Sequence, residues 1–147
     1  MNTRTFHKQY ISNLDASRHA AEDIVPFWQL LALDEAIISQ MELCLVEVVN
    51  NVFEHAYGNH EGSSFDIRSY LNSKQQLIIE ISDHGAAMPK HILEHLPSAA
   101  FIEPVEDDPS TWLQSSRGLK IVQQLTDKLE YISKNNSNIF RMLKETA

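Results

Sequence analysis

The sequence predicts an α+β fold, a two-layer α/β sandwich in which helices cover one face of a mostly antiparallel, mixed sheet. Two patterns indicate this fold. Apolar residues recur at helical spacing over long stretches, and shorter runs rich in β-branched and aromatic residues flank polar turns. The chain has 147 residues, of which 43% are hydrophobic, and this is enough for one sizeable core. We therefore expect a single domain over residues 1–147.

The first part of the chain is expected to form a strand followed by two helices. Residues 4–12 alternate aromatic and β-branched residues with polar ones, as a half-buried strand does. Residues 14–32 place apolar side chains at helical spacing, and Trp28 belongs to the face that should be buried. A longer helical pattern covers residues 34–57 and carries the first group of polar residues discussed below.

The rest of the chain is expected to form two hairpins separated by a lid and a helix. The runs 65–71 and 76–82 are strand-like and are joined by a polar turn, so we expect them to pair antiparallel. The segment at about 84–116 mixes Gly, Pro, Asp and Ser, and loops of this length are usually functional. After it we expect a helix and a closing hairpin, over residues 117–126, 128–133 and 139–143.

Charge and composition argue against several classes of protein. Asp and Glu outnumber Lys and Arg by 20 to 12, and the resulting net charge of −8 disfavours direct binding to nucleic acid or to an anionic membrane. The N-terminus has no apolar signal-peptide region, and we find no apolar run of the roughly 18–20 residues that a membrane span needs. The single cysteine, Cys44, cannot form an intrachain disulfide. These features favour a cytoplasmic protein with protein or small-molecule partners.

Three polar residues lie four apart in the second expected helix. Glu47, Asn51 and His55 should share one face of it. A stripe of this kind is typical of a solvated helix face. It also suits a metal site, because an amide oxygen is a hard ligand for Mg²⁺, which keeps several waters and takes phosphate oxygens as further ligands. Glu47 would then lie one turn away, where a carboxylate polarises an attacking hydroxyl or water. The stripe alone leaves both interpretations open.

A second group follows the strand at 76–82. Asp83 comes at the end of this apolar strand, and Gly85 follows in a tight turn. A carboxylate that points into the fold needs a donor, and the exocyclic amine of adenine is one such donor. Gly85 would allow the backbone to approach a base without a Cβ in the way. An ordinary Asp-x-Gly turn gives the same pattern.

A third group precedes the last expected helix. Ser115, Ser116, Arg117 and Gly118 come before an amphipathic run that begins with Leu119. A flexible loop that opens a helix presents free N–H groups and the positive end of the helix dipole to anions such as phosphates. A plain helix start with a serine cap has the same appearance.

The order and spacing of the three groups resemble those of a known superfamily. The segments ELCLVEVVNNVFEHAY, ISDHGAAMP and SSRGLKIVQQLTDKLEY are similar to the N box and the two glycine boxes of the GHKL ATPases, and most of all to those of the anti-sigma-factor serine/threonine kinases. The resemblance extends over roughly residues 5 to 143 and implies the Bergerat fold, which is the histidine-kinase-like ATPase fold.

The resemblance also implies roles for individual residues, with ATP and Mg²⁺ as cofactors. Glu47 is expected to be the catalytic general base, Asn51 the magnesium ligand and Asp83 the carboxylate that reads adenine. The other residues expected to line the cofactor site are His55, Gly85, Ala87, Arg117, Gly118 and Leu119. His55 belongs to the HAY segment. It could contact phosphate or only brace the helix, and the bracing role is favoured.

The implied activity is transfer of the ATP γ-phosphate to a serine or threonine of an anti-anti-sigma (STAS-domain) protein, alternating with capture of a sigma factor or another regulatory protein. A homodimer is compatible with this. Two positions depart from the family pattern, because Ala87 and Ser116 stand where glycine is common. A nucleotide-binding partner-switch module with little catalysis is therefore an alternative, and the ATPase domain of a histidine kinase is another.

Overall fold

The computed structural model describes residues 4–88 and 111–146, with the side chains of residues 111–117 left out. Within these residues one sheet contains five strands in the order β1-β2-β3-β5-β4. The strands are β1 (Thr5–Ile11), β2 (Ser64–Leu71), β3 (Gln76–Asp83), β4 (Lys128–Lys134) and β5 (Ser137–Glu145). All four strand pairs are antiparallel, so the described sheet is not mixed as the sequence prediction allowed.

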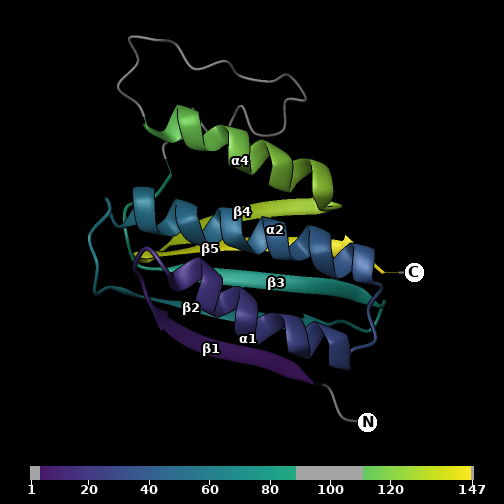
Figure 1. Ribbon diagram of the computed structural model, residues 1–147. Coiled ribbons are helices and arrows are strands. Elements are labelled where there is room, and N and C mark those ends of the chain that lie inside the picture. Colours follow the sequence, from purple (N-terminus) through teal and green to yellow (C-terminus); the bar gives the residue numbers. More distant parts are fainter. Residues whose placement is uncertain (1–3, 89–110, 147) are drawn as a thin grey trace.

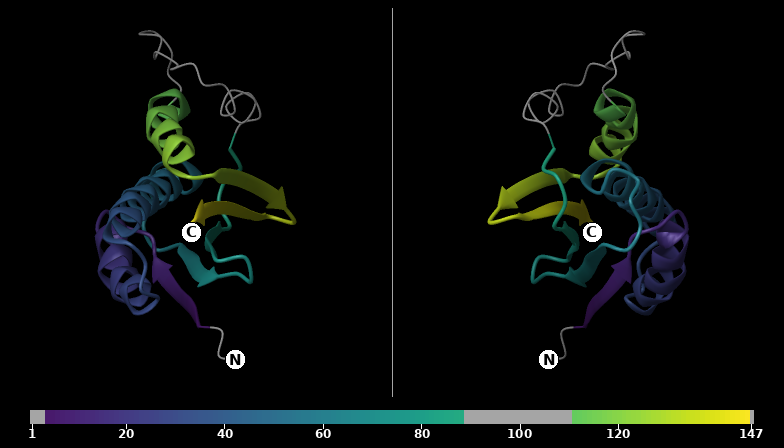
Figure 2. Two further views of the ribbon diagram at one scale, coloured as in Figure 1. Left: turned by 90° about the vertical axis from the view of Figure 1, so that its right-hand side faces the viewer. Right: turned by 90° about the vertical axis from the view of Figure 1, so that its left-hand side faces the viewer.

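The described helices cover one face of this sheet (Figures 1 and 2). They are α1 (Ala16–Leu30), α2 (Glu35–Asn51) with its continuation η1 (Val52–Ala56), and α4 (Thr111–Leu125). α2 lies between α1 and α4, and it packs against both. The predicted α+β architecture and the order of its elements are therefore confirmed.

The core lies between the two layers. Every second residue of β3 points at the helices, and Leu77, Ile79 and Ile81 are fully buried there. Trp28 of α1 is also fully buried, as the sequence predicts, and its indole N–H donates to Ser69 Oγ at 3.1 Å. Ser69 Oγ in turn donates to a backbone carbonyl of β3, so the polar atoms of this pair are satisfied inside the core.

The central helix is unusually apolar. Glu35–Ala56 is 22 residues long, and by length and composition alone it could cross a membrane. Here its apolar face packs against the sheet, and its flanks pack against α1 and α4. The position of this helix between three other elements accounts for its composition, because a helix buried on several sides is apolar on several sides.

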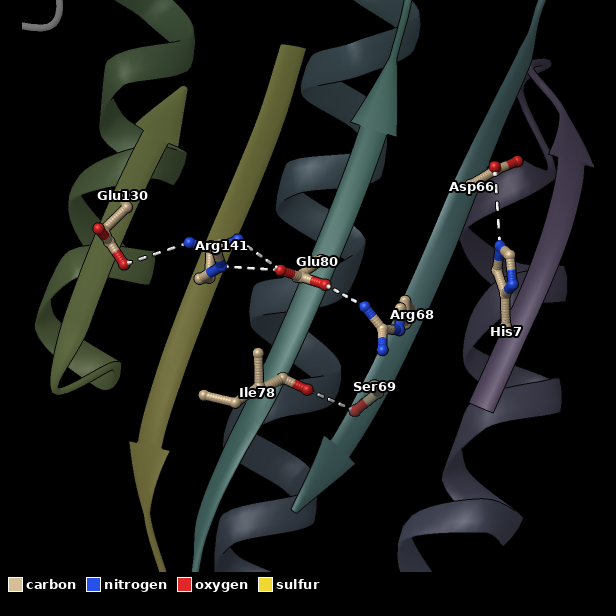
Figure 3. Close-up of polar contacts among 8 residues, drawn as sticks. All are labelled: His7, Asp66, Arg68, Ser69, Ile78, Glu80, Glu130 and Arg141. Atoms are coloured by element: carbon tan, nitrogen blue, oxygen red, sulfur yellow. Dashed lines mark hydrogen bonds and ion pairs between the residues drawn. The ribbon is translucent and has the colours of Figure 1, made fainter. Parts of the chain in front are cut away.

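The sheet face that the described helices leave uncovered carries a row of charges (Figure 3). Glu80 of β3 accepts a hydrogen bond from Arg141 Nε at 2.7 Å and lies 3.6 Å from a guanidinium nitrogen of Arg68. Arg141 also comes within 4.0 Å of Glu130. These residues occupy facing positions on β2, β3, β5 and β4 and form alternating cross-strand pairs.

Two boundaries differ from the prediction. α4 begins at Thr111, six residues earlier than predicted, so the expected loop at 115–118 is helical. The closing hairpin turns over Asn135 and Asn136, whose φ angles are 54° and 62°, a conformation that asparagine tolerates. This tight turn extends both strands and places Asn138 inside β5. Of the lid predicted at 84–116, residues 89–110 lie outside the described part of the chain.

Candidate functional site

Asp83 ends β3 with its side chain almost fully buried, at 1% exposure. Its Oδ1 accepts hydrogen bonds from the Gly85 backbone N–H and from Asn138 Nδ2, both at 2.9 Å. Burial raises the pKa of the Asp83 carboxyl, and the two donors and nearby His84 oppose this only in part. The hydrogen bonds that described residues give to this carboxylate end on Oδ1, which leaves Oδ2 as an acceptor.

The turn after β3 is held tightly against the end of η1. The Ala86 N–H donates to the Ala56 carbonyl at 2.8 Å. A Cβ on Gly85 would lie 2.6 Å from the Ala56 carbonyl carbon and 2.8 Å from Tyr57 Cδ1, so this position has no room for a side chain. We expected the missing side chain of Gly85 to leave room for a ligand. In the structure this room is taken by the backbone at the end of η1.

Tyr57 and Tyr131 also hold this turn, and the sequence analysis assigned neither a role. The Tyr57 hydroxyl accepts from the His84 N–H at 3.0 Å and donates to the Ser64 carbonyl at 2.5 Å. The Tyr131 hydroxyl accepts from the Met88 N–H at 3.0 Å. The segment that follows Asp83 is therefore tied to η1, β2 and β4 rather than free at its start.

Asn51 is the last residue of α2 and is 4% exposed. Its Nδ2 is buried, and no hydrogen-bond partner for it occurs in the structure as described. The two ends of an amide differ only by a rotation about χ2, so either the nitrogen or the oxygen can occupy this position. A buried amide without a partner calls for an explanation, and a bound ion or its water is one. The residue fits the magnesium role implied by the resemblance.

The predicted stripe changes direction after Asn51, because η1 is a π-helical turn with the Tyr57 N–H bonded to the Val52 carbonyl at 3.0 Å. His55 therefore does not continue the line of Glu47 and Asn51 at the α-helical angle. The side chain of His55 is buried, and burial lowers its pKa. This burial agrees with the favoured bracing role.

Glu47 meets α4 at Gly118. A Cβ on Gly118 would lie 3.2 Å from the carboxyl carbon of Glu47 and closer still to one of its oxygens, so glycine gives the carboxylate its place against this helix. Burial first, and the charge of Glu54 second, raise the pKa of Glu47. A carboxylate with a raised pKa is a better proton acceptor, as a general base requires.

The third group of residues does not lie in a loop that opens the helix, as the prediction expected. Residues 115–118 lie beyond the first turn of α4, where N–H groups bond to carbonyls of the preceding turn. Leu119 is 1% exposed and belongs to the core. Arg117 lies in α4, and its side chain is outside the described part. Ala87 is exposed in the segment after β3.

The structure nevertheless brings the groups together around the second half of α2. Gly118 contacts Glu47, and the turn of Asp83 and Gly85 rests on Ala56. Ala56 follows Asn51 by five residues, about 7 Å along a helix axis. The turn after Asp83 therefore packs between one and two turns from Asn51 along the same helix. A cluster of three or more His, Cys, Asp or Glu side chains suited to a metal does not occur among the described residues, so a metal here would rely on Asn51, water and ligand oxygens.

Asn138 is a further residue of this site that sequence reasoning missed. It lies directly opposite Asp83 in the β3–β5 register and is 2% exposed. A signal for it exists in the sequence, because Asn138 occupies a core-facing position in the alternation with Phe140 and Met142. A polar residue in such a position needs partners, and Asp83 provides one.

Comparison with known proteins supports the fold. A family model described as the histidine kinase-like ATPase domain matches residues 11–144. No curated protein sequence matches the chain. Among solved structures, the RsbU and RsbW domains of Rv1364c from Mycobacterium tuberculosis superpose with a TM-score of 0.68 at 12% identity, over 97% of this chain and 32% of that one. This chain thus spans about a third of that protein.

Two further structures are similar over most of both chains. The SiaB–SiaC complex from Pseudomonas aeruginosa gives a TM-score of 0.65 at 9% identity, covering 92% of this chain and 88% of that chain. The catalytic domain of the histidine kinase ThkA, in a nucleotide-free form, gives 0.53 at 15% identity, covering 99% and 98%. At such low identity these likenesses establish the shared fold alone.

Proposed function

This chain belongs to the histidine kinase-like ATPase domain family, and we propose from that premise that it binds ATP with Mg²⁺ and phosphorylates a serine or threonine of a partner protein. The observation that carries the proposal is Asp83, a buried carboxylate at a strand end with one oxygen held by the protein and the other left as an acceptor. The exocyclic amine of adenine matches such an acceptor.

The described residues fit ATP and magnesium in their chemistry. Asp83 would accept from the base, and Asn51 would be the one protein ligand of a metal that takes its other ligands from water and phosphate. Magnesium neutralises the charge of the transferred phosphoryl group, and positioning supplies much of the remaining acceleration. Glu47, whose pKa is raised by burial, would take the proton of the attacking hydroxyl.

Equilibrium binding of ATP, measured with and without Mg²⁺ by calorimetry, tests the first part of the proposal. We expect the wild type to bind ATP with micromolar affinity in the presence of Mg²⁺. Without Mg²⁺, the wild type and an Asn51→Ala variant should both bind ATP more weakly than this. Indifference to ATP under both conditions would reject nucleotide binding and leave only the fold.

The second part concerns phosphoryl transfer and its acceptor. We propose an anti-anti-sigma (STAS-domain) protein as the acceptor and a sigma factor or another regulatory protein as a second, sequestered partner, in the cytoplasm. SiaB was solved as a complex with another protein, which supports a protein partner for a domain of this fold. Incubation with Mg²⁺–ATP and the cognate STAS protein should give a phosphate mass shift. A homodimer, which light scattering detects, is part of the same proposal.

A second candidate is a binding module that holds nucleotide and a partner with little catalysis. The observation in its favour is that residues 115–118, which were expected to form a flexible loop before the helix, are helical here. This version predicts that Glu47→Gln leaves partner binding intact and that Asp83→Asn abolishes it. A loss of partner control in the Glu47 variant alone would exclude it. If the chain is instead the ATPase domain of a histidine kinase, the phosphate would appear on a histidine. Acid treatment removes phosphate from histidine but not from serine, so it distinguishes the two.

A further inference from the structure

Both the nitrogen and the oxygen of the Asn138 side-chain amide form hydrogen bonds. Its Nδ2 donates to Asp83 Oδ1 and to the Gly85 carbonyl, each at 2.9 Å. Its Oδ1 accepts from Ser133 Oγ at 2.7 Å. The residue lies in β5, opposite Asp83 of β3, and is 2% exposed. One buried side chain therefore joins the strand end, the turn after it and the neighbouring strand β4.

This network fixes the orientation of the amide. A carboxylate oxygen and a backbone carbonyl are both acceptors, so only the NH₂ end of Asn138 can face them. On the other side, the Ser133 hydroxyl donates to the carbonyl end. A hydroxyl can donate or accept, so the two acceptors at the NH₂ end decide the orientation. Asn138 is thus a donor toward Asp83 in one defined orientation.

The Asp83 carboxylate is fixed in consequence. Asn138 and the Gly85 N–H approach the same oxygen, Oδ1, and the strand pairing holds the backbones on both sides. Rotation of the carboxylate would break two hydrogen bonds in a buried place, where unpaired polar groups are expensive. Oδ2 is therefore held in a constant direction and is available as an acceptor.

We propose that Asn138 is a positioning residue for base selection, which holds Asp83 so that Oδ2 accepts from the amine of a 6-aminopurine and rejects a 6-oxopurine. The inference rests on the proposed function, since it assumes that Asp83 meets the base of a nucleotide. A fixed acceptor discriminates because a purine carbonyl in place of the amine would face a carboxylate with no proton between them.

The test compares the affinities of the full chain for ATP and for inosine triphosphate (ITP), which differ in the 6-substituent of the base. Both are titrated into the wild type and into Asn138→Ala, in the presence of Mg²⁺. We expect the preference for ATP over ITP to fall roughly 5- to 30-fold in the variant, the factor that corresponds to one or two lost kcal/mol. Asn138→Ser keeps one donor and should retain part of the preference, and it serves also if the alanine variant does not fold.

A matched control is available at the other end of β3. Asn72 accepts from the Lys74 and Gln76 N–H groups at 2.9 and 3.0 Å and donates to the Gln76 side chain at 2.8 Å, so it loses comparable hydrogen bonds in Asn72→Ala. Asn72 lies just before β3, and the length of this strand places its first residue about 23 Å from Asp83 at its end. We expect this variant to be less stable while its preference for ATP over ITP stays at the wild-type value.

The outcomes separate the inference from the function on which it rests. Equal losses of ATP and ITP affinity in Asn138→Ala would leave the preference unchanged and would mean that Asn138 acts only through stability. Unchanged affinities for both nucleotides would mean that it has no part in binding or selection. Either result overturns the inference while nucleotide binding stands. A wild type that binds neither nucleotide overturns both. A selective loss of ATP, with partial retention in Asn138→Ser, supports the inference.

Discussion

Two buried carboxylates on the same strand illustrate how a structural group differs from a functional one. Glu80 and Asp83 are three residues apart in β3 and point to opposite faces of the sheet. The Glu80 side chain is 11% exposed, and two arginines compensate its charge on the open face (Figure 3). Asp83 lies on the helix side, and the donors that the described chain gives it are a neutral amide and a backbone N–H.

The difference is one of charge balance. A carboxylate between two guanidinium groups has its partners within the protein, so it needs nothing further. A carboxylate held by neutral donors in a buried place retains an unbalanced charge, and the pKa of Asp83 is raised accordingly. Perturbed groups of this kind gather at functional sites. The comparison therefore predicts that Asp83 serves ligand binding and Glu80 serves stability.

The largest expected effect is that of Asp83→Asn on ATP binding. The substitution keeps the size of the side chain and removes the charged acceptor, so ATP affinity should fall roughly 10- to 100-fold, as expected for the loss of a hydrogen bond to a charged group. Titration calorimetry measures this loss. Glu80→Gln is the matched control on the same strand and should bind ATP within about twofold of the wild type. Equal losses in the two variants would break the comparison.

Gly85→Ala should have the next largest effect, because a Cβ there would lie 2.6 Å from the Ala56 carbonyl carbon. The turn would have to move off η1, and Asp83 would move with it. We expect a loss of about 1–3 kcal/mol in the free energy of unfolding, as for other overpacked sites, together with weaker ATP binding. Urea denaturation measures the first quantity. Ala87→Gly, at an exposed position in the same segment, is the control for stability and should change the free energy of unfolding by less.

Glu80→Gln should lower the free energy of unfolding. Arg141 would lose its charged partner, but its side chain is 34% exposed and water would screen the remaining charge. We therefore expect about 1–2 kcal/mol, less than for a fully buried pair. Glu130→Gln, which removes a more exposed carboxylate 4.0 Å from Arg141, should cost at most about 0.5 kcal/mol by urea denaturation. A larger loss for Glu130→Gln than for Glu80→Gln would contradict this account of the charge row.

The same contrast shows what could be predicted from sequence. The pattern of the chain was sufficient for the layers, both hairpins and the burial of Trp28, because these depend on periodicity within short segments. Asp83 could be singled out because its neighbours in sequence, an apolar strand and Gly85, mark a strand end. The row of charges on the open face could not be predicted, because only the register of the sheet brings Glu80 next to Arg68 and Arg141.

The contact between Asn138 and Asp83 and the start of α4 could not be predicted from local sequence, for two different reasons. Asn138 contacts Asp83 across 55 residues of sequence, and the tight turn that places it inside β5 depends on two successive asparagines with positive φ. The start of α4 was placed too late because serines before Gly118 suit a loop or a helix start, and the packing of Gly118 on Glu47 decides between these. Tertiary contact overrides propensity in such segments.

The last prediction concerns how the contribution of Asp83 to the free energy of unfolding depends on pH. Its folded pKa lies above the ordinary value of 3.8, mainly because of burial, so the folded state binds a proton more tightly than the unfolded state does. The favourable contribution of the protonated carboxyl is complete below 3.8 and is lost as pH rises through the folded pKa. At neutral pH, Asp83→Asn should therefore be more stable than the wild type, by on the order of 1 kcal/mol. Thermal unfolding from pH 3.5 to 8 should show this advantage shrinking as pH falls, whereas Glu80→Gln should gain no stability at neutral pH. A constant difference between wild type and Asp83→Asn would mean that Asp83 is as well compensated as Glu80, and the distinction between the two carboxylates would be lost.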